Sequence, residues 1–176
     1  MSLAVTVVPA PGPIGALTVG VTAAGLALVG FGAVPELTRR AAARLGVPVV
    51  DDAGATAEAE AQLAGYLAGE RRRFTLPLDW SLTAGSQRRV LQALRDSVPF
   101  GATVTYGELA LRAALGGGHT AARGVGAVMG SNPIPVVVPC HRVLAADGLG
   151  GFGGGRATKE WLLALEGVLT PALDLG

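Results

Sequence analysis

Hydrophobic residues in the first half of the chain fall into short runs separated by glycine and proline. Runs of this kind, bounded by turn residues, predict β-strands. The predicted strands are residues 14–19, 26–31 and 47–50. Apolar residues at helical spacing predict one helix over 36–45, with Gly46 as its stop, and a second helix capped by Thr56. This pattern favours a small α/β unit.

The second half of the chain has the spacing of helices. The predicted helices are residues 86–98, 105–114, 120–129 and 158–165. Thr105 and Glu108 form a capping box at the start of the second one. The two short helices on either side of the 116–118 glycine turn predict a helix-turn-helix. Most helical hairpins of this kind do not bind DNA, so the motif alone does not indicate a DNA-binding protein.

A change of composition separates the two halves. Residues 74–85 are rich in Pro, Asp, Ser, Thr and Gly, as in segments that join domains. We therefore expect a first domain over 1–80, a linker over 81–85 and a second domain over 86–176.

Composition and charge exclude several classes of protein. The chain has 176 residues, half of them hydrophobic, and a net charge of +1, so it can bury a core but is no polybasic DNA binder. Its one cysteine excludes an intramolecular disulfide and a cysteine zinc site. The uncharged stretch 2–35 is broken by glycine and proline, which argues against a membrane span, and no signal peptide is visible. We expect a soluble cytoplasmic protein.

The most distinctive chemistry surrounds that cysteine. The apolar run 134–138 predicts a buried strand or extended segment that carries Cys140 into the fold. His141 and Arg142 supply positive potential, which favours a thiolate. Side chains of neighbouring residues diverge in extended chain, so we expect no direct hydrogen bond between Cys140 and His141. A lone cysteine can equally be a small buried hydrophobic residue.

Other polar residues leave alternatives open. Arg123, expected in the first turn of its helix, and Glu166, at the end of the last helix, both oppose the helix dipole. Either they are plain surface or a partner holds them there. We expect His119 to be a solvated loop residue and Arg71–Arg73 to be a solvated helix end. The 148–153 segment matches G-x-G-x-x-G without a surrounding βαβ unit, which favours a loop that closes over a ligand.

Taken together, these motifs resemble a known family. Residues 138–143, Val-Pro-Cys-His-Arg-Val, resemble the active-site signature of the O6-alkylguanine-DNA alkyltransferases, the methylated-DNA–protein-cysteine methyltransferases. Further segments stand in the family's order: 13–19, 62–69, 74–79, 98–106, 121–126, 131–133 and 159–166. The resemblance therefore covers most of the chain.

The resemblance implies a fold and an activity. It implies an α/β N-terminal domain of RNase H-like shape and a mostly helical C-terminal domain with a plain or winged helix-turn-helix. The activity would be direct-reversal repair of double-stranded DNA containing O6-alkylguanine. The lesion would be flipped out, and its alkyl group transferred irreversibly to Cys140, once per molecule. No cofactor or metal is implied, and the protein would be a monomer, with cooperativity on DNA left open.

The resemblance also assigns roles to individual residues. The implied catalytic group is Cys140, His141, Glu166, Asn132 and Tyr106. In this group we expect His141 to be the base, acting on the thiol through a water molecule and oriented by Glu166. The implied DNA contacts are Arg123, Tyr106, Ala122, Thr120, Gly124 and Ser131, with Arg123 as the finger that replaces the flipped base. The implied alkylguanine pocket is Val143, Phe152, Gly153 and Lys159.

The sequence departs from the family pattern at several positions. Ser86 and Leu91 stand where aromatic residues are usual, Gly124 replaces an alanine, and Phe152 replaces a tyrosine. The turn over 115–120 is a few residues longer than usual. Two other functions compete with the transferase: a cysteine hydrolase, which would turn over repeatedly, and a non-catalytic module that flags lesions, whose relatives lack the cysteine.

Overall fold

The computed structural model describes residues 1–170 and is mixed α/β. Strands β1 (Leu3–Pro9), β2 (Ala16–Thr22), β3 (Gly25–Phe31) and β4 (Val49–Val50) form a sheet in the order β3-β2-β1-β4. The β1–β2 and β2–β3 pairs are antiparallel, whereas β4 runs parallel to β1. A 3₁₀ turn, η1 (Gly12–Ile14), joins the first two strands.

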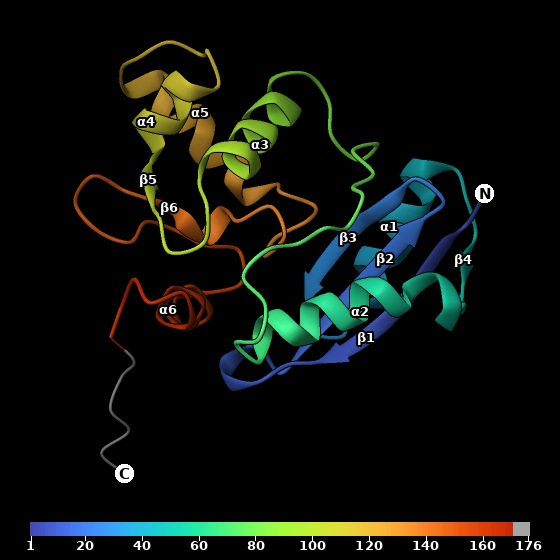
Figure 1. Ribbon diagram of the computed structural model, residues 1–176. Helices are drawn as coiled ribbons and strands as arrows, with labels where there is room; N and C mark the ends of the chain where they lie inside the picture. Colours follow the sequence, from blue (N-terminus) through green and yellow to red (C-terminus); the bar gives the residue numbers. More distant parts are fainter. Residues whose placement is uncertain (171–176) are drawn as a thin grey trace.

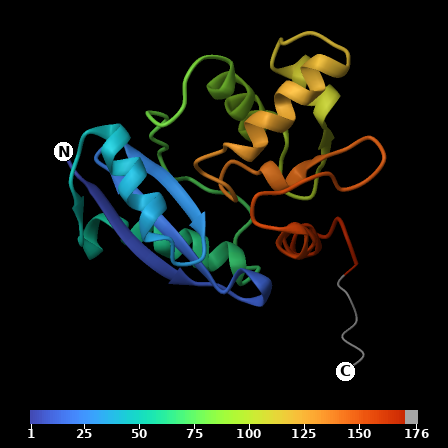
Figure 2. The same cartoon turned by 180° about the vertical axis from the view of Figure 1, so that it is seen from behind.

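Helices cover both faces of this sheet (Figures 1 and 2). Helix α1 (Pro35–Leu45) packs on one face over a small core that includes Leu3 and Leu28. Helix α2 (Ala53–Leu67) lies on the other face, where the larger core continues into the second half of the molecule. Gly46 adopts a left-handed conformation and ends α1 as the sequence predicts.

Three details of the first half correct the sequence-based prediction. Strand β1 was not predicted, yet it lies inside the sheet, where it is hydrogen-bonded to both β2 and β4. The predicted strand 14–19 begins too early, because Ile14 belongs to η1. Helix α2 is capped by Asp52, whose carboxylate accepts from the Ala55 amide, while Thr56 is buried inside the helix.

The second half is mostly helical. Its elements are α3 (Gly85–Ser97), β5 (Val104–Thr105), α4 (Tyr106–Arg112), α5 (His119–Gly130), η2 (Cys140–Arg142), β6 (Val143–Leu144) and α6 (Arg156–Leu165). Short strands β5 and β6 pair in parallel and bring the start of α4 beside the cysteine segment. The Thr105 hydroxyl accepts from the Glu108 amide, which confirms the predicted cap. Of the expected second domain, residues 171–176 lie outside the described part of the chain.

The connection between the halves packs against the sheet. Leu26 of β3 is hydrogen-bonded on both sides to this segment, through the Pro77 carbonyl and the Asp79 amide. The Asp79 carboxylate is buried and accepts from the Thr22 hydroxyl. The two halves also meet directly, since the Val29 amide donates to the Pro133 carbonyl. The second half is therefore held firmly against β3.

Within residues 1–170, no helix is both long and apolar enough to cross a membrane. The uncharged N-terminal stretch instead supplies β1, β2 and β3.

Candidate active site

The segment before Cys140 is a compact turn rather than the predicted strand or extended segment. The Val138 amide donates to the Ile134 carbonyl over 2.9 Å, and Val136 has a φ of 73°. A positive φ is rare for a β-branched residue and indicates a strained backbone. The expected burial is confirmed, because Ile134, Val136 and Val138 are inaccessible to solvent or nearly so.

Asn132 holds this turn from within. Its side-chain amide donates to the Val138 carbonyl, and its side-chain oxygen accepts from the Ile134 amide, each over 3.0 Å. These two bonds satisfy buried backbone groups that the turn would otherwise leave unpaired. The same amide also acts on the Cys140 thiol, whose pKa it lowers. Asn132 thus shapes the segment that presents the cysteine.

Glu166 is the centre of a buried hydrogen-bond network. It is the residue that caps the C-terminal end of α6. Its carboxylate accepts from Tyr66 Oη over 2.6 Å, and His141 Nε2 lies 2.8 Å away. Arg142 donates to both carboxylate oxygens, from Nε over 2.7 Å and from Nη2 over 2.9 Å. Glu166 is therefore not a plain surface residue, because partners hold its carboxylate at the helix end that is unfavourable for a negative charge.

This network sets the charge states of its members. Although burial alone would raise it, the hydrogen bonds from His141 and Arg142 hold the pKa of Glu166 well below its usual range. Burial lowers the pKa of His141, against the opposing effect of Glu166. At neutral pH we therefore assign a neutral imidazole beside a carboxylate.

The tautomer of His141 follows from its partner. An ionised carboxylate can only accept, so Nε2 carries the imidazole proton. The second ring nitrogen, Nδ1, then has a free lone pair and is buried without a hydrogen-bond partner among the described residues. A neutral imidazole oriented in this way by a carboxylate can act as a general base.

Cys140 lies next to the network, and within residues 1–170 its thiol forms no hydrogen bond with the His141 imidazole. Burial raises the pKa of the thiol to about 11, while Asn132 and the Lys159 ammonium act in the lowering direction. Lys159 is itself completely buried, and its Nζ donates to the Val143 carbonyl over 2.7 Å and to the Gly151 carbonyl over 3.3 Å. This lysine joins the strand after the cysteine to the glycine loop and places a positive charge near the thiol.

Tyr106 and Phe152 lie beside the same loop. Partial burial raises the pKa of the Tyr106 phenol, which is close enough to Cys140 for the two charges to interact. The phenol also contacts the loop, because a Cβ at Gly150 would lie 2.7 Å from its oxygen. Phe152 packs edge-on against Phe31 of β3, with ring centroids 5.5 Å apart. The loop is therefore fixed from both halves of the molecule.

Helices α4 and α5 present the expected DNA-contacting residues. Thr120, Arg123, Gly124 and Ser131 are exposed, and Ala122 is half-buried. Two sequence-based placements were wrong. Helix α5 begins at His119, which is exposed but helical rather than a loop residue, and Arg123 therefore lies in the second turn of the helix, not the first. Gly153 of the expected pocket is exposed.

Among residues 1–170, no group of three or more His, Cys, Asp and Glu side chains is placed to hold a metal ion.

Comparison with known proteins shows which family this chain resembles in sequence. Residues 85–168 match the model of the 6-O-methylguanine DNA methyltransferase DNA-binding domain. A methylated-DNA–protein-cysteine methyltransferase of Mycolicibacterium paratuberculosis is 49% identical over 121 residues, which cover 67% of this chain and 69% of that protein. The chain belongs to the methylated-DNA–protein-cysteine methyltransferase family.

Solved structures of the family extend the likeness to the whole fold. The Mycobacterium tuberculosis O6-methylguanine methyltransferase has a TM-score of 0.73 and 36% identity, covering 97% of this chain and 96% of that one. The Mycobacterium tuberculosis OGT in complex with DNA has a TM-score of 0.72 and 35% identity, covering 94% of this chain and 92% of that one.

The sequence likeness also extends to mammals. A methylated-DNA–protein-cysteine methyltransferase of Mus musculus is 54% identical over 85 residues, which are 47% of this chain and 39% of that protein.

Two members of the Glu166 network were not foreseen in their roles. Tyr66 was assigned to the apolar face of its helix, and it is indeed completely buried, but its hydroxyl binds Glu166. A buried tyrosine needs a partner for its hydroxyl, and that is the signal that could have found it. Arg142 was expected only to add positive potential, whereas its Nε and Nη2 both donate hydrogen bonds to the Glu166 carboxylate.

Proposed function

We propose that the protein repairs alkylated DNA by direct reversal, transferring the alkyl group from O6 of guanine to Cys140. The family, together with one observation of this chain, supports the proposal: Cys140 is buried beside a His141 that is neutral, anchored by Glu166 and free to accept a proton at Nδ1. That arrangement suits a nucleophilic thiol served by a general base.

In the proposed reaction, His141 takes the thiol proton through a water molecule, because neighbouring side chains do not meet directly. The thiolate attacks the alkyl carbon in line with the C–O bond. A C–S bond forms, and the electron pair of the broken C–O bond stays on guanine, which takes up one proton. Tyr106 donates to the base as charge develops on it. The thioether is stable, so each molecule reacts once.

We further propose that the DNA contacts come from α4, α5 and the turn that follows. Amides at the start of α5 meet a phosphate, with Thr120, Ala122, Gly124 and Ser131 along the duplex. Arg123 fills the space of the flipped guanine. The exposure of the α5 residues and the likeness to an OGT solved with DNA support this arrangement.

The flipped base would be bound next to the glycine loop. Phe152, Val143 and Gly153 are proposed as its walls. Lys159 contributes by tying the Val143 and Gly151 carbonyls together, which keeps the strand after Cys140 beside the loop.

We also propose how the chain is organised and where it works. The first unit, residues 1–80, is RNase H-like, and the unit over 86–176 carries a helix-turn-helix of plain or winged form. Residues 81–85 link the two. The protein works in the cytoplasm as a monomer, where a reducing environment keeps its one cysteine free.

The function is tested by counting transfers. The protein is incubated with an excess of duplex oligonucleotide carrying O6-methylguanine and then measured by mass spectrometry. One methyl group per chain, on the peptide that contains Cys140, is expected. The Cys140→Ser variant should bind the duplex and stay unmodified. Repeated turnover would instead indicate a hydrolase, and DNA binding without any transfer would indicate a lesion-flagging module.

A further inference from the structure

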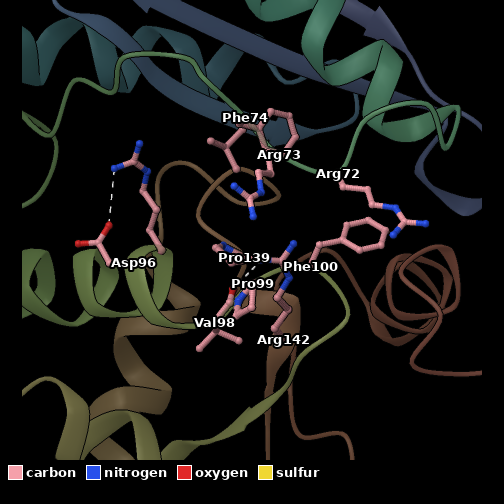
Figure 3. Close-up of a pocket in the computed structure, with 11 residues that line it drawn as sticks. Arg72, Arg73, Phe74, Asp96, Val98, Pro99, Phe100, Pro139 and Arg142 are labelled. Carbon is pink, nitrogen blue, oxygen red and sulfur yellow. Dashed lines mark hydrogen bonds and ion pairs between the residues drawn. The ribbon is translucent and has the colours of Figure 1, made fainter.

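A cavity of about 650 Å³ lies between the two halves of the molecule, on the side of Glu166 and Arg142 (Figure 3). Its walls come from the segment after α2, the C-terminal end of α3 and the residues around Pro139. Four arginines and a single acidic residue line it: Arg72, Arg73, Arg95, Arg142 and Asp96. This is a high local charge for a chain whose net charge is only +1.

Several donors in this cavity are unused. Arg142 is buried and spends three N–H groups on Glu166 and the Val98 carbonyl, which leaves two of its five. Arg73 forms no side-chain hydrogen bond or ion pair within residues 1–170, and Figure 3 shows its guanidinium pointing toward Pro139 and Arg142. Arg95 has Asp96 as its acidic partner, at a distance of 3.8 Å.

The remaining arginine lies at the rim. The Arg72 guanidinium stacks over the Phe100 ring, 5.4 Å from its centre. The proposed alkyl transfer uses none of Arg72, Arg73 and Arg95. Arg72 and Arg73 have no acidic partner within residues 1–170, whereas Asp96 and Glu166 already offset Arg95 and Arg142. A bound anion would neutralise the two uncompensated charges.

We propose that this cavity binds an oligophosphate. Arginine forks match phosphate oxygens, and several phosphates in a row carry three or four negative charges past the arginines that line the cavity. An acidic peptide spreads the same charge over a longer chain and suits the cavity less well. The volume lies in the range of nucleotide-sized sites. The phosphates could come from a free nucleotide or from a DNA backbone, and the experiment separates these sources.

The test uses sodium tripolyphosphate as the probe, titrated into the full chain by isothermal calorimetry at constant ionic strength. The cavity variant is Arg73→Gln/Arg95→Gln. The matched control, Arg39→Gln/Arg156→Gln, loses the same charge from exposed arginines elsewhere. One charge-assisted contact corresponds to about tenfold in affinity, so the cavity variant should bind about a hundredfold more weakly. The control should stay within about twofold of the unmodified protein.

Equal affinities in the cavity and control variants would overturn the proposal, since they would show diffuse charge rather than a site. So would binding of tripolyphosphate weaker than about 1 mM by the unmodified protein. Circular dichroism checks that both variants are folded, and the single exposed-residue change Arg73→Gln, with its expected tenfold loss, serves if the double variant is not.

A second titration identifies the source of the phosphates. Tripolyphosphate is added to protein already saturated with an undamaged duplex, and the titration is repeated with ATP on the free protein. Undiminished binding on the duplex, with ATP at least as tight as tripolyphosphate, assigns the cavity to a free nucleotide. Competition by duplex against tripolyphosphate, together with duplex binding that is weakened in the cavity variant but not in the control, assigns the cavity to a DNA backbone. Neither readout depends on alkyl transfer, so this proposal can fail while the proposed function stands.

Discussion

Raising the pH should accelerate alkylation of Cys140 in the free protein over an unusually wide range. The thiolate is the reactive form of a cysteine. Burial raises the pKa of this thiol to about 11. An ordinary thiol, with a pKa of about 8.5, is already mostly ionised at pH 9, whereas Cys140 would be almost entirely protonated there.

The size of the effect follows from these two values. At pH 7 a pKa of about 11 leaves roughly one thiolate in ten thousand, against about three in a hundred for an ordinary thiol. Between pH 7 and pH 9 the rate for Cys140 should rise about a hundredfold without levelling off. Restricted access to the buried sulfur lowers every rate by the same factor and leaves this slope unchanged.

The assay is reaction with iodoacetamide, followed by intact-protein mass spectrometry from pH 7 to pH 9.5. Because the chain has one cysteine, every adduct reports on Cys140, and Cys140→Ser gives the background. Glutathione in the same buffers provides the ordinary thiol, and circular dichroism checks the fold at each pH. A rate that levels off below pH 9 would refute the reasoning, because it would mean that the cationic and polar neighbours outweigh burial.

Three further outcomes are expected. Glu166→Gln should cost about 3–5 kcal/mol of unfolding free energy at pH 7, because it leaves the Arg142 charge buried and unpaired. The pKa of Glu166 is lowered in the folded protein, so the stability that its carboxylate contributes is lost as the pH falls below about 4. Urea denaturation should therefore show the variant and the unmodified protein becoming more alike at those pH values. Tyr66→Phe should cost about 1.5–3 kcal/mol in the same assay at pH 7, and a loss under 0.5 kcal/mol would remove the phenol from the network. Arg123→Ala should slow alkyl transfer in duplex DNA far more than in single strands carrying the same O6-methylguanine, and equal losses would reduce Arg123 to a backbone contact.

Most helices could be predicted from the sequence because their faces and caps are local. Gly46 ends α1, and Thr105 caps α4. Strand β1 was missed because no turn residue marks its start, although Pro9 and Pro11 mark its end. The compact turn before Cys140 was missed for another reason: an unbroken apolar run is equally compatible with a strand, and the bonds from Asn132 that decide the matter join backbone to side chain.

The candidate site was predictable as far as its residues are adjacent or belong to a family motif. Cys140, His141 and Glu166 were found in that way. The contact between His141 and Glu166 was also expected. The bond from Tyr66 was not, because Tyr66 and Glu166 are 100 residues apart and come together only when the last turn of α2 reaches the C-terminal end of α6. A carboxylate at a helix C-terminus suggested a partner, and the family motif named His141, but neither identified Tyr66 and Arg142 as further donors.

The Glu166 network also explains why the first half matters to chemistry performed in the second. Residues 85–168, which match the family's DNA-binding domain, contain Cys140, His141 and Glu166. Yet one hydrogen bond to that carboxylate comes from Tyr66 in α2, and the loop beside the cysteine packs through Phe152 against Phe31 in β3. The hydrogen bond is buried, so solvent does not screen it. The α/β half therefore fixes the orientation of Glu166 and the position of the glycine loop, and the state of the thiol depends on both halves being docked.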